Sequence, residues 1–398
     1  MMKRREFLLS AAGAGVAALS FSADALAGSR ARAGAAGGGS DIIVGYTGPF
    51  TGPLAHYGIS MAAGTNAVFK KVNEAGGIRG HRLRLVTGDD QFNPKKAQAA
   101  YQHCFDEGAV VFAGNFGTPT TAAALPWIAA HKIPVVGIYS GAGIFRHPVN
   151  PYIFHYRGSL QSEANNIRSF LDAQQNNRVM ILSEQDKYGQ ACTTAMELAY
   201  GKSMAYLGSA YINTYGNMDD ATKVAKAIME KHPTALVLGM TTKIGALVVQ
   251  ALRKAGYGKK QELLIAISGI GPSGFAKAIP PKMRPGILVS TVVPFPYGGG
   301  THAGFSAQFR ADMKAAGVSE DVNFSGMEGY LNALVLTQAL KQAKSFTPAD
   351  ITAALNGMGE FHIGTPPDDF RFDISPTNHS GTKYTNLVLM NEDGTYSN

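Results

Sequence analysis

The sequence predicts an α/β protein with two lobes, each built on a parallel-sheet core. Short apolar runs, typical of buried strands, alternate with segments of helical periodicity from Asp41 to Ser268. The first strands end in loops rich in Gly, Pro and hydroxyl residues, and the carboxyl edge of a parallel sheet is where ligands collect. The 398 residues are enough for two cores.

The first unit opens with a strand from Asp41 and a Gly/Pro-rich loop that runs to Gly58. Counting this unit, the order strand, small-residue loop and helix repeats three times within about one hundred residues. Strands are expected at His81–Thr87, Gly108–Gly114 and Ile133–Gly137, and helices at Ile59–Asn73, Lys95–Asp106 and Ala122–His131. The strand ends should therefore bring several small-residue loops to one edge of the sheet.

A second series of similar size follows Tyr156-Arg157-Gly158. Helices are expected at Ser162–Gln174, Gln190–Lys202, Asp220–Lys231 and Ile244–Ala255, and strands at Arg178–Ser183, Ser209–Thr214, Ala235–Gly239, Leu263–Ser268 and Gly286–Val293. The pattern then changes to two long helices, Thr301–Ala316 and Ser325–Ala343, and a last strand, Tyr384–Met390.

The N-terminus has the features of an export signal at residues 1–27. Lys3-Arg4-Arg5 precedes a weakly apolar Ala/Gly-rich run, and Ala25-Leu26-Ala27 offers small residues for cleavage. The paired arginines favour the twin-arginine route, and the run is too short and too rich in Ala and Gly for a membrane span. We expect a flexible tail at residues 28–40 and a soluble protein in the periplasm.

The charge distribution argues against a nucleic-acid-binding protein, and the positions of the two cysteines argue against a disulfide. The formal net charge is +8, but Lys and Arg are scattered and form no contiguous basic face, so no nucleic-acid partner is expected. Cys104 and Cys192 fall in different predicted lobes. We expect them to be free, buried thiols.

The motifs of common enzymes are missing or incomplete. Gly269-Ile270-Gly271-Pro272-Ser273-Gly274 fits the dinucleotide fingerprint, but Pro272 removes an amide and no acidic residue follows at the usual distance. No Gly-x-Ser-x-Gly elbow occurs, and no His or Cys set has metal spacing. We therefore expect no cofactor, no metal and no catalysis. Reversible binding in the cleft is the favoured function, with an enzyme as the weaker alternative.

Several blocks resemble a known family. They are Ile42 to Pro53 with His56-Tyr57-Gly58, Asn73 to Gly80, Asp89-Asp90 before Asn93-Pro94, Asp186 to Gly189, and Met327 to Tyr330. Together they resemble the branched-chain amino acid class of periplasmic solute-binding proteins of ABC importers. The resemblance implies the fold of a type I periplasmic binding protein, with two Rossmann-like lobes joined by a three-stranded hinge. The three crossings would lie near Tyr156–Arg157, Val292–Pro294 and Ile363–Phe370. One lobe would then comprise residues 41–156 and 294–365, and the other residues 157–293 and 366–398.

The resemblance also implies a site. The first lobe would hold a ligand carboxylate with loop hydroxyls and amides, while aromatic side chains close the cleft. These positions are Tyr57, Phe116, Gly117, Thr118, Tyr139, Ser140 and Gly141 in the first lobe, and Tyr188, Met240, Thr241, Gly269, Ile270 and Phe295 in the second. The partners would be a small molecule and the permease subunits, with the protein a monomer. A ligand sensor on the same fold is the alternative to transport.

One departure from the family bears on the ligand. Where the family has the acid that binds an amino group, this chain has Gly269-Ile270-Gly271. A buried ammonium needs a carboxylate partner, and Asp186 and Glu328 are the substitutes that the sequence offers. Two ligand classes stay open, an apolar amino acid and a carboxylate with a hydrophobic or aromatic body. The missing acid and the apolar cleft candidates favour the second class.

Overall fold

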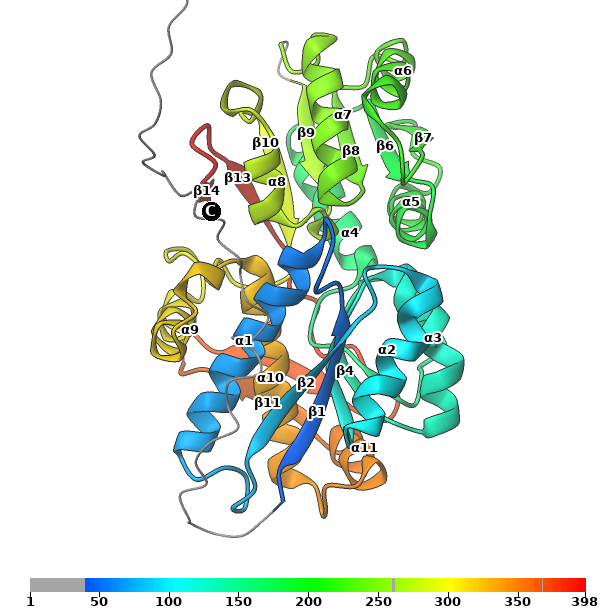
Figure 1. The fold of residues 1–398 in the computed structure, drawn as a ribbon. Coiled ribbons are helices and arrows are strands. Elements are labelled where there is room, and N and C mark those ends of the chain that lie inside the picture. Colours follow the sequence, from blue (N-terminus) through cyan, green and yellow to red (C-terminus); the bar gives the residue numbers. More distant parts are fainter. Residues whose placement is uncertain (1–39, 260–261, 367) are drawn as a thin grey trace, which may run out of the picture. The chain divides into compact units, whose positions relative to one another are not determined.

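A computed structural model describes residues 40–259, 262–366 and 368–398 (Figure 1). The expected export signal and residues 28–39 of the expected tail lie outside these residues. The described chain contains two sheets with parallel cores and a two-stranded hairpin. The predicted α/β class with two lobes is confirmed.

The first lobe is built on a five-stranded sheet in the order β2-β1-β3-β4-β5, in which all neighbouring pairs are parallel. Its strands are β1 (Ile42–Gly48), β2 (Leu83–Asp89), β3 (Val111–Phe116), β4 (Val135–Tyr139) and β5 (Ile153–Phe154). Every residue of β3 and β4 is buried. Strands covered on both faces need such continuous apolar runs, which is why they were recognisable in the sequence.

The helices of the first lobe come from two separate parts of the chain. They are α1 (Ala55–Glu74), α2 (Pro94–Asp106), α3 (Thr118–His131), α9 (Ala303–Ala316), α10 (Phe324–Gln342) and α11 (Pro348–Asn356). Helix α1 contacts both α9 and α10, so the two long helices return to the first lobe, as the resemblance implies. The antiparallel hairpin of β11 (Gly359–Ile363) and β12 (Phe370–Ile374) follows α11.

Helices α1 and α10 approach closely because glycines lie where they cross. A Cβ on Gly64 would lie 2.0 Å from the carbonyl oxygen of Gly326, and a Cβ on Gly329 would lie 2.0 Å from that of Met61. Thr65 Oγ1 donates to the Gly329 carbonyl at 3.2 Å across the same contact. The glycine of the Met327–Tyr330 block is therefore required by helix packing.

The second lobe is built on a seven-stranded sheet in the order β14-β13-β10-β9-β8-β6-β7. Strands β7, β6, β8, β9 and β10 are parallel, while β13 and β14 extend the sheet in antiparallel pairing. The strands are β6 (Val179–Glu184), β7 (Tyr206–Ile212), β8 (Ala235–Gly239), β9 (Leu263–Ala266), β10 (Ile287–Thr291), β13 (Asn386–Met390) and β14 (Tyr396–Ser397). The helices are α4 (Leu160–Ala173), α5 (Lys187–Tyr200), α6 (Met218–Met229), α7 (Thr242–Lys254) and α8 (Pro272–Ala278).

The third crossing between the lobes differs from its expected position at Ile363–Phe370. Those two residues pair with each other in the β11–β12 hairpin, so the segment between them is a hairpin connection. The chain reaches β13 only through residues 375–385. Within that stretch, the carbonyl of His379 accepts from His155 N, and Gly381 N donates to the carbonyl of His155, both at 2.8 Å. We infer that the third crossing lies beside the first and that the lobe boundary falls after Ile374.

The two cysteines are free and buried, as the sequence predicts. Cys104 lies in α2 of the first lobe and Cys192 in α5 of the second. Burial raises the pKa of each thiol, that of Cys104 to about 12. Neither thiol is therefore reactive at neutral pH.

Candidate ligand-binding cleft

Tyr57 connects the two lobes. It is fully buried in the first turns of α1. Its hydroxyl lies 2.8 Å from Thr242 Oγ1, at the start of α7, and 3.1 Å from the Gly269 carbonyl. Tyr57 donates to the Gly269 carbonyl and Thr242 Oγ1 donates to the Ile270 carbonyl at 2.6 Å, and either hydroxyl could be the donor in the contact between them. Burial raises the pKa of Tyr57, so the phenol keeps its proton at neutral pH.

Replacing Tyr57 by Phe should weaken the contact between the lobes and leave the ring packing intact. One net hydrogen bond contributes about 0.5–1.5 kcal/mol. Small-angle scattering of the unliganded protein should therefore show a larger radius of gyration for Tyr57→Phe than for the parent. Identical scattering would show that this hydroxyl does not hold the lobes together.

Tyr57, Phe116 and Tyr139 form one aromatic cluster below this contact. Their ring centroids lie 4.6 Å (Tyr57–Phe116), 4.9 Å (Phe116–Tyr139) and 5.6 Å (Tyr57–Tyr139) apart. Phe116 and Tyr139 end the neighbouring strands β3 and β4, so the sheet register brings them together. Three of the first-lobe residues expected at the site are thus in mutual contact.

Thr118 and Ser140 form a hydroxyl pair beside that cluster. Their Oγ1 and Oγ atoms are 2.8 Å apart, and both side chains are buried. Thr118 is the first residue of α3, and Gly117 before it has φ 94°, a conformation that favours Gly. Hydroxyls at a helix N-terminus suit a carboxylate. Gly141 has a packing role, since a Cβ there would lie 2.6 Å from Leu160 N.

The glycines at 269 and 271 make room for two phenols. A Cβ on Gly269 would lie 2.2 Å from Tyr188 Oη, and a Cβ on Gly271 would lie 2.1 Å from Tyr57 Oη. Gly271 also has φ +69°. The tyrosines therefore account for the small residues that stand where the resembling family has an acid.

The remaining second-lobe residues that were expected at the site do not all lie in one place. Met240 and Ile270 are fully buried in the core of that lobe. Phe295 lies in a different aromatic group, with Tyr297 and Phe324 at 5.4 and 6.0 Å. Thr241 is bonded to Glu184 and reaches an open hollow.

That hollow has a volume of about 560 Å³ and is lined by both lobes. The first lobe contributes Pro53, Leu54, Gln91, Phe92, Asn93, Pro94 and Pro119, and the second contributes Gln185, Asp186, Asn213, Thr214, Tyr215, Thr241, Lys243 and Ile244. Among the predicted site residues, Thr241 alone is part of this lining, while Tyr57, Thr118, Ser140 and Tyr188 are buried. Most of the lining residues were expected to be turn or cap residues. Their position directly after β2, β6, β7 and β8 could have identified them as residues of the ligand-binding edge.

A buried ionic cluster lies where the first crossing meets both lobes. Arg157 Nη1 is 3.3 Å from Glu328 Oε2, and Arg157 Nη2 is 3.9 Å from Glu163 Oε1 and donates to Ser268 Oγ at 2.6 Å. Tyr156 also donates to Glu328. Since Glu328 already has these two partners and is buried, Asp186 is the one sequence-proposed substitute acid that faces the hollow.

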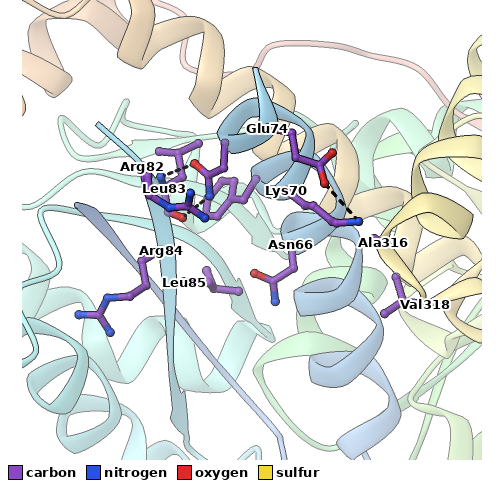
Figure 2. Close-up of a pocket in the computed structure, with 11 residues that line it drawn as sticks. Asn66, Lys70, Glu74, Arg82, Leu83, Arg84, Leu85, Ala316 and Val318 are labelled. Atoms are coloured by element: carbon purple, nitrogen blue, oxygen red, sulfur yellow. Dashed lines mark hydrogen bonds and ion pairs between the residues drawn. The ribbon is translucent and has the colours of Figure 1, made fainter. Parts of the chain in front are cut away.

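A second hollow of about 510 Å³ lies at the other end of the first sheet (Figure 2). Its lining includes Arg82 to Leu85 at the beginning of β2, together with α1 and the residues after α9. Asn73 of α1 bonds the backbone of Leu83 through both ends of its amide, at 2.8 and 2.9 Å. Because parallel sheets bind ligands at the carboxyl ends of their strands, we assign the ligand site to the hollow between the lobes.

The sequence profile of the family described as "Periplasmic binding protein" matches residues 41–395. The chain belongs to the periplasmic binding protein family. Proteins of this family lie in the periplasm. Within residues 40–259, 262–366 and 368–398, no helix has both the length and the apolar character of a membrane span.

Curated relatives of this periplasmic binding protein match over part of their length. The chain is 32% identical over 105 residues to the Leu/Ile/Val-binding protein homolog 1 of Brucella abortus, which is 26% of this chain and 25% of the relative. It is 25% identical over 264 residues to the Leu/Ile/Val-binding protein of Escherichia coli, 66% of each chain.

Solved structures share the fold along nearly the whole chain. An extracellular ligand-binding receptor from Verminephrobacter eiseniae superposes with a TM-score of 0.80 at 23% identity and covers 90% of this chain and 100% of its own. A branched-chain amino acid ABC transporter structure from Thermus thermophilus with bound valine gives 0.76 at 17% identity, covering 91% and 96%. A solute-binding protein from R. palustris in complex with 4-hydroxybenzoate gives 0.76 at 18% identity, covering 90% and 95%.

Proposed function

We propose that this periplasmic binding protein is the solute-binding component of an ABC importer, capturing a small carboxylate between its lobes and delivering it to the permease. The observation that carries the proposal is the Thr118–Ser140 hydroxyl pair at the start of α3, on the sheet edge that faces the second lobe. Beside it, Tyr57 reaches across to Thr242 and Gly269. A ligand held there contacts both lobes and stabilises their closed arrangement to the extent of those contacts.

The ligand is a carboxylate with an apolar body, with or without an amino group. The aromatic cluster supplies apolar surface, and the hydroxyl pair supplies donors for one carboxylate. The resembling structures with valine and with 4-hydroxybenzoate represent these two classes in other proteins. Twin-arginine export and a monomeric state complete the proposal.

Calorimetric titration against amino acids and aromatic and aliphatic acids tests this function. Ala at Thr118 or at Ser140 should each reduce the affinity by about 1–3 kcal/mol, the range for a hydrogen bond to a charged group. Thr222→Ala, on the exposed face of α6, is the matched control and should leave the affinity unchanged. Unchanged affinity in both cleft variants would show that these loops are structural turns.

Two further outcomes would contradict transport. Chemical turnover of a bound compound would identify an enzyme. Normal uptake of the ligand by cells that lack this protein, together with tight binding to a receptor or regulator, would identify a sensor.

A further inference from the structure

Two carboxylates lie at the end of strand β6, and in each of them only one of the two oxygens accepts a hydrogen bond from the described part of the chain. Glu184 Oε1 accepts from Thr241 N at 3.1 Å and from Thr241 Oγ1 at 2.7 Å, and Asp186 Oδ1 accepts from Gly189 N at 2.8 Å. Glu184 Oε2 and Asp186 Oδ2 are buried and have no hydrogen-bond partner among the described residues. Each acid thus caps a helix, α7 or α5, with one oxygen and keeps the other oxygen unbonded.

Asp186 lines the hollow between the lobes, and Glu184 is buried behind its wall. Asp186 and Thr241 line the hollow, and Glu184 lies directly behind Thr241, to which it is bonded. The charge of Glu184 also acts on Tyr57 of the first lobe, the residue that bridges to Thr242. The unbonded oxygens therefore lie where the second lobe meets the first.

A buried carboxylate oxygen without a donor has lost its hydration without a compensating hydrogen bond, which destabilises its charged form. Burial accordingly raises the pKa of Glu184 to about 7, with the charge of Asp186 as a further cause, and it raises the pKa of Asp186. A cationic donor that reached both acids would form charge-assisted hydrogen bonds and remove this cost. Lys243 is an exposed residue of the hollow, and among the described residues it forms no ion pair with either acid.

We propose that Glu184 and Asp186 form an ammonium-binding subsite, so that the ligand is an amino acid. This inference rests on the proposed function. The carboxylate of the ligand is held by Thr118 and Ser140 in the first lobe and its ammonium by the acids at the end of β6 in the second. The subsite replaces the acid that the resembling family carries in the loop now occupied by Gly269-Ile270-Gly271. It also reverses the preference for an acid without an amino group that the sequence alone suggested.

Pairs of ligands that differ only in the amino group test the subsite. Calorimetry compares L-leucine with 4-methylpentanoate and L-phenylalanine with 3-phenylpropanoate. The parent should bind the better amino acid at least roughly tenfold more tightly than its deaminated partner, and Glu184→Gln should remove that preference. The amide oxygen of Gln still accepts from Thr241, so the cap on α7 is kept. Asp186→Asn should also reduce that preference. Glu197→Gln is the control, because it removes one negative charge from an exposed residue of α5.

The pH dependence provides an independent readout. An ammonium favours the ionised form of Glu184, so affinity for the amino acid should fall as the pH drops from about 8 to about 6, and binding near pH 7 should release protons. The other titratable groups of this region are Asp186, whose pKa burial also raises, Tyr57 and Cys192, whose pKa values burial raises above their ordinary range, and His56, whose pKa burial lowers. Glu184→Gln should abolish the proton release.

Two results would overturn the subsite, and they differ in what they say of transport. Deaminated acids that bind as well as the amino acids, with Glu184→Gln unchanged, would reject the ammonium subsite and leave the proposed function standing. No heat and no rise in melting temperature with any of the four probes would reject the subsite and would also count against a carboxylate-binding function.

Discussion

Replacing Arg157 by Met should lower the free energy of unfolding by about 3–5 kcal/mol, the cost of leaving a buried charge without its partner. Arg157 is the cation between Glu163 and Glu328, and the exposed fractions of these three side chains are 2%, 0% and 3%. Its guanidinium also lies 4.7 Å from the ring centroid of Tyr139. The Met side chain fills much of the volume but leaves two carboxylates without a counter-charge. Urea unfolding followed by circular dichroism measures the loss.

Arg371→Met is the matched control. Arg371 pairs with Glu360 at 2.6 Å, but these side chains are 65% and 50% exposed. Exposed pairs contribute about 0–1 kcal/mol, so this variant should remain close to the parent. Similar losses in both variants would show that the buried cluster is not a special source of stability.

Replacing Gly329 by Val should force α1 and α10 apart. The added Cβ would lie 2.0 Å from the carbonyl oxygen of Met61 and 2.7 Å from its carbon, and backbone atoms cannot turn aside as a side chain can. Overpacking of this kind costs about 1–3 kcal/mol and occasionally more, and we expect the upper part of that range. Because α1 also carries Tyr57, affinity for the ligand should fall together with stability.

Gln342→Val, at the exposed end of α10, controls for the poor helix propensity of Val. It should change the unfolding midpoint by much less than Gly329→Val. A Gly329→Val protein with the stability and the affinity of the parent would contradict the packing role that we assign to this glycine.

Continuous apolar runs made the central strands predictable. Ala235–Gly239 was expected as a strand and is β8. Every one of its residues is buried, which explains its continuous apolar run. The hairpin of β11 and β12 was missed because its alternating pattern stands next to Gly and Pro residues and pairs with no strand of either main sheet. Helix α8 starts at Pro272 and ends at Ala278, so Pro280 and Pro281 follow the helix and do not break it.

The candidate site residues were named from the family resemblance, and the sheet explains why four of them lie together. Phe116 and Tyr139 end the adjacent strands β3 and β4, two residues beyond the expected strand ends, and Thr118 and Ser140 follow them. Arg157, Glu163 and Ser268 meet only in three dimensions, and no local pattern links them. Glu184 was read as a loop residue, but it is the last residue of β6 and is fully buried. Its burial depends on the neighbouring strand, loop and lobe, which a single sequence does not show.

The side-chain amide of Asn73 forms, on the unpaired side of β2, two hydrogen bonds of the kind that a further strand would form. Strand β2 is the last in its sheet, and a bare strand edge can template aggregation with other molecules. By accepting from Leu83 N and donating to Leu83 O, Asn73 occupies the hydrogen-bonding groups that an incoming chain would use first. The charged Arg82 and Arg84 flank that position (Figure 2). This end of the β2 edge is thereby protected from edge-to-edge pairing with another chain.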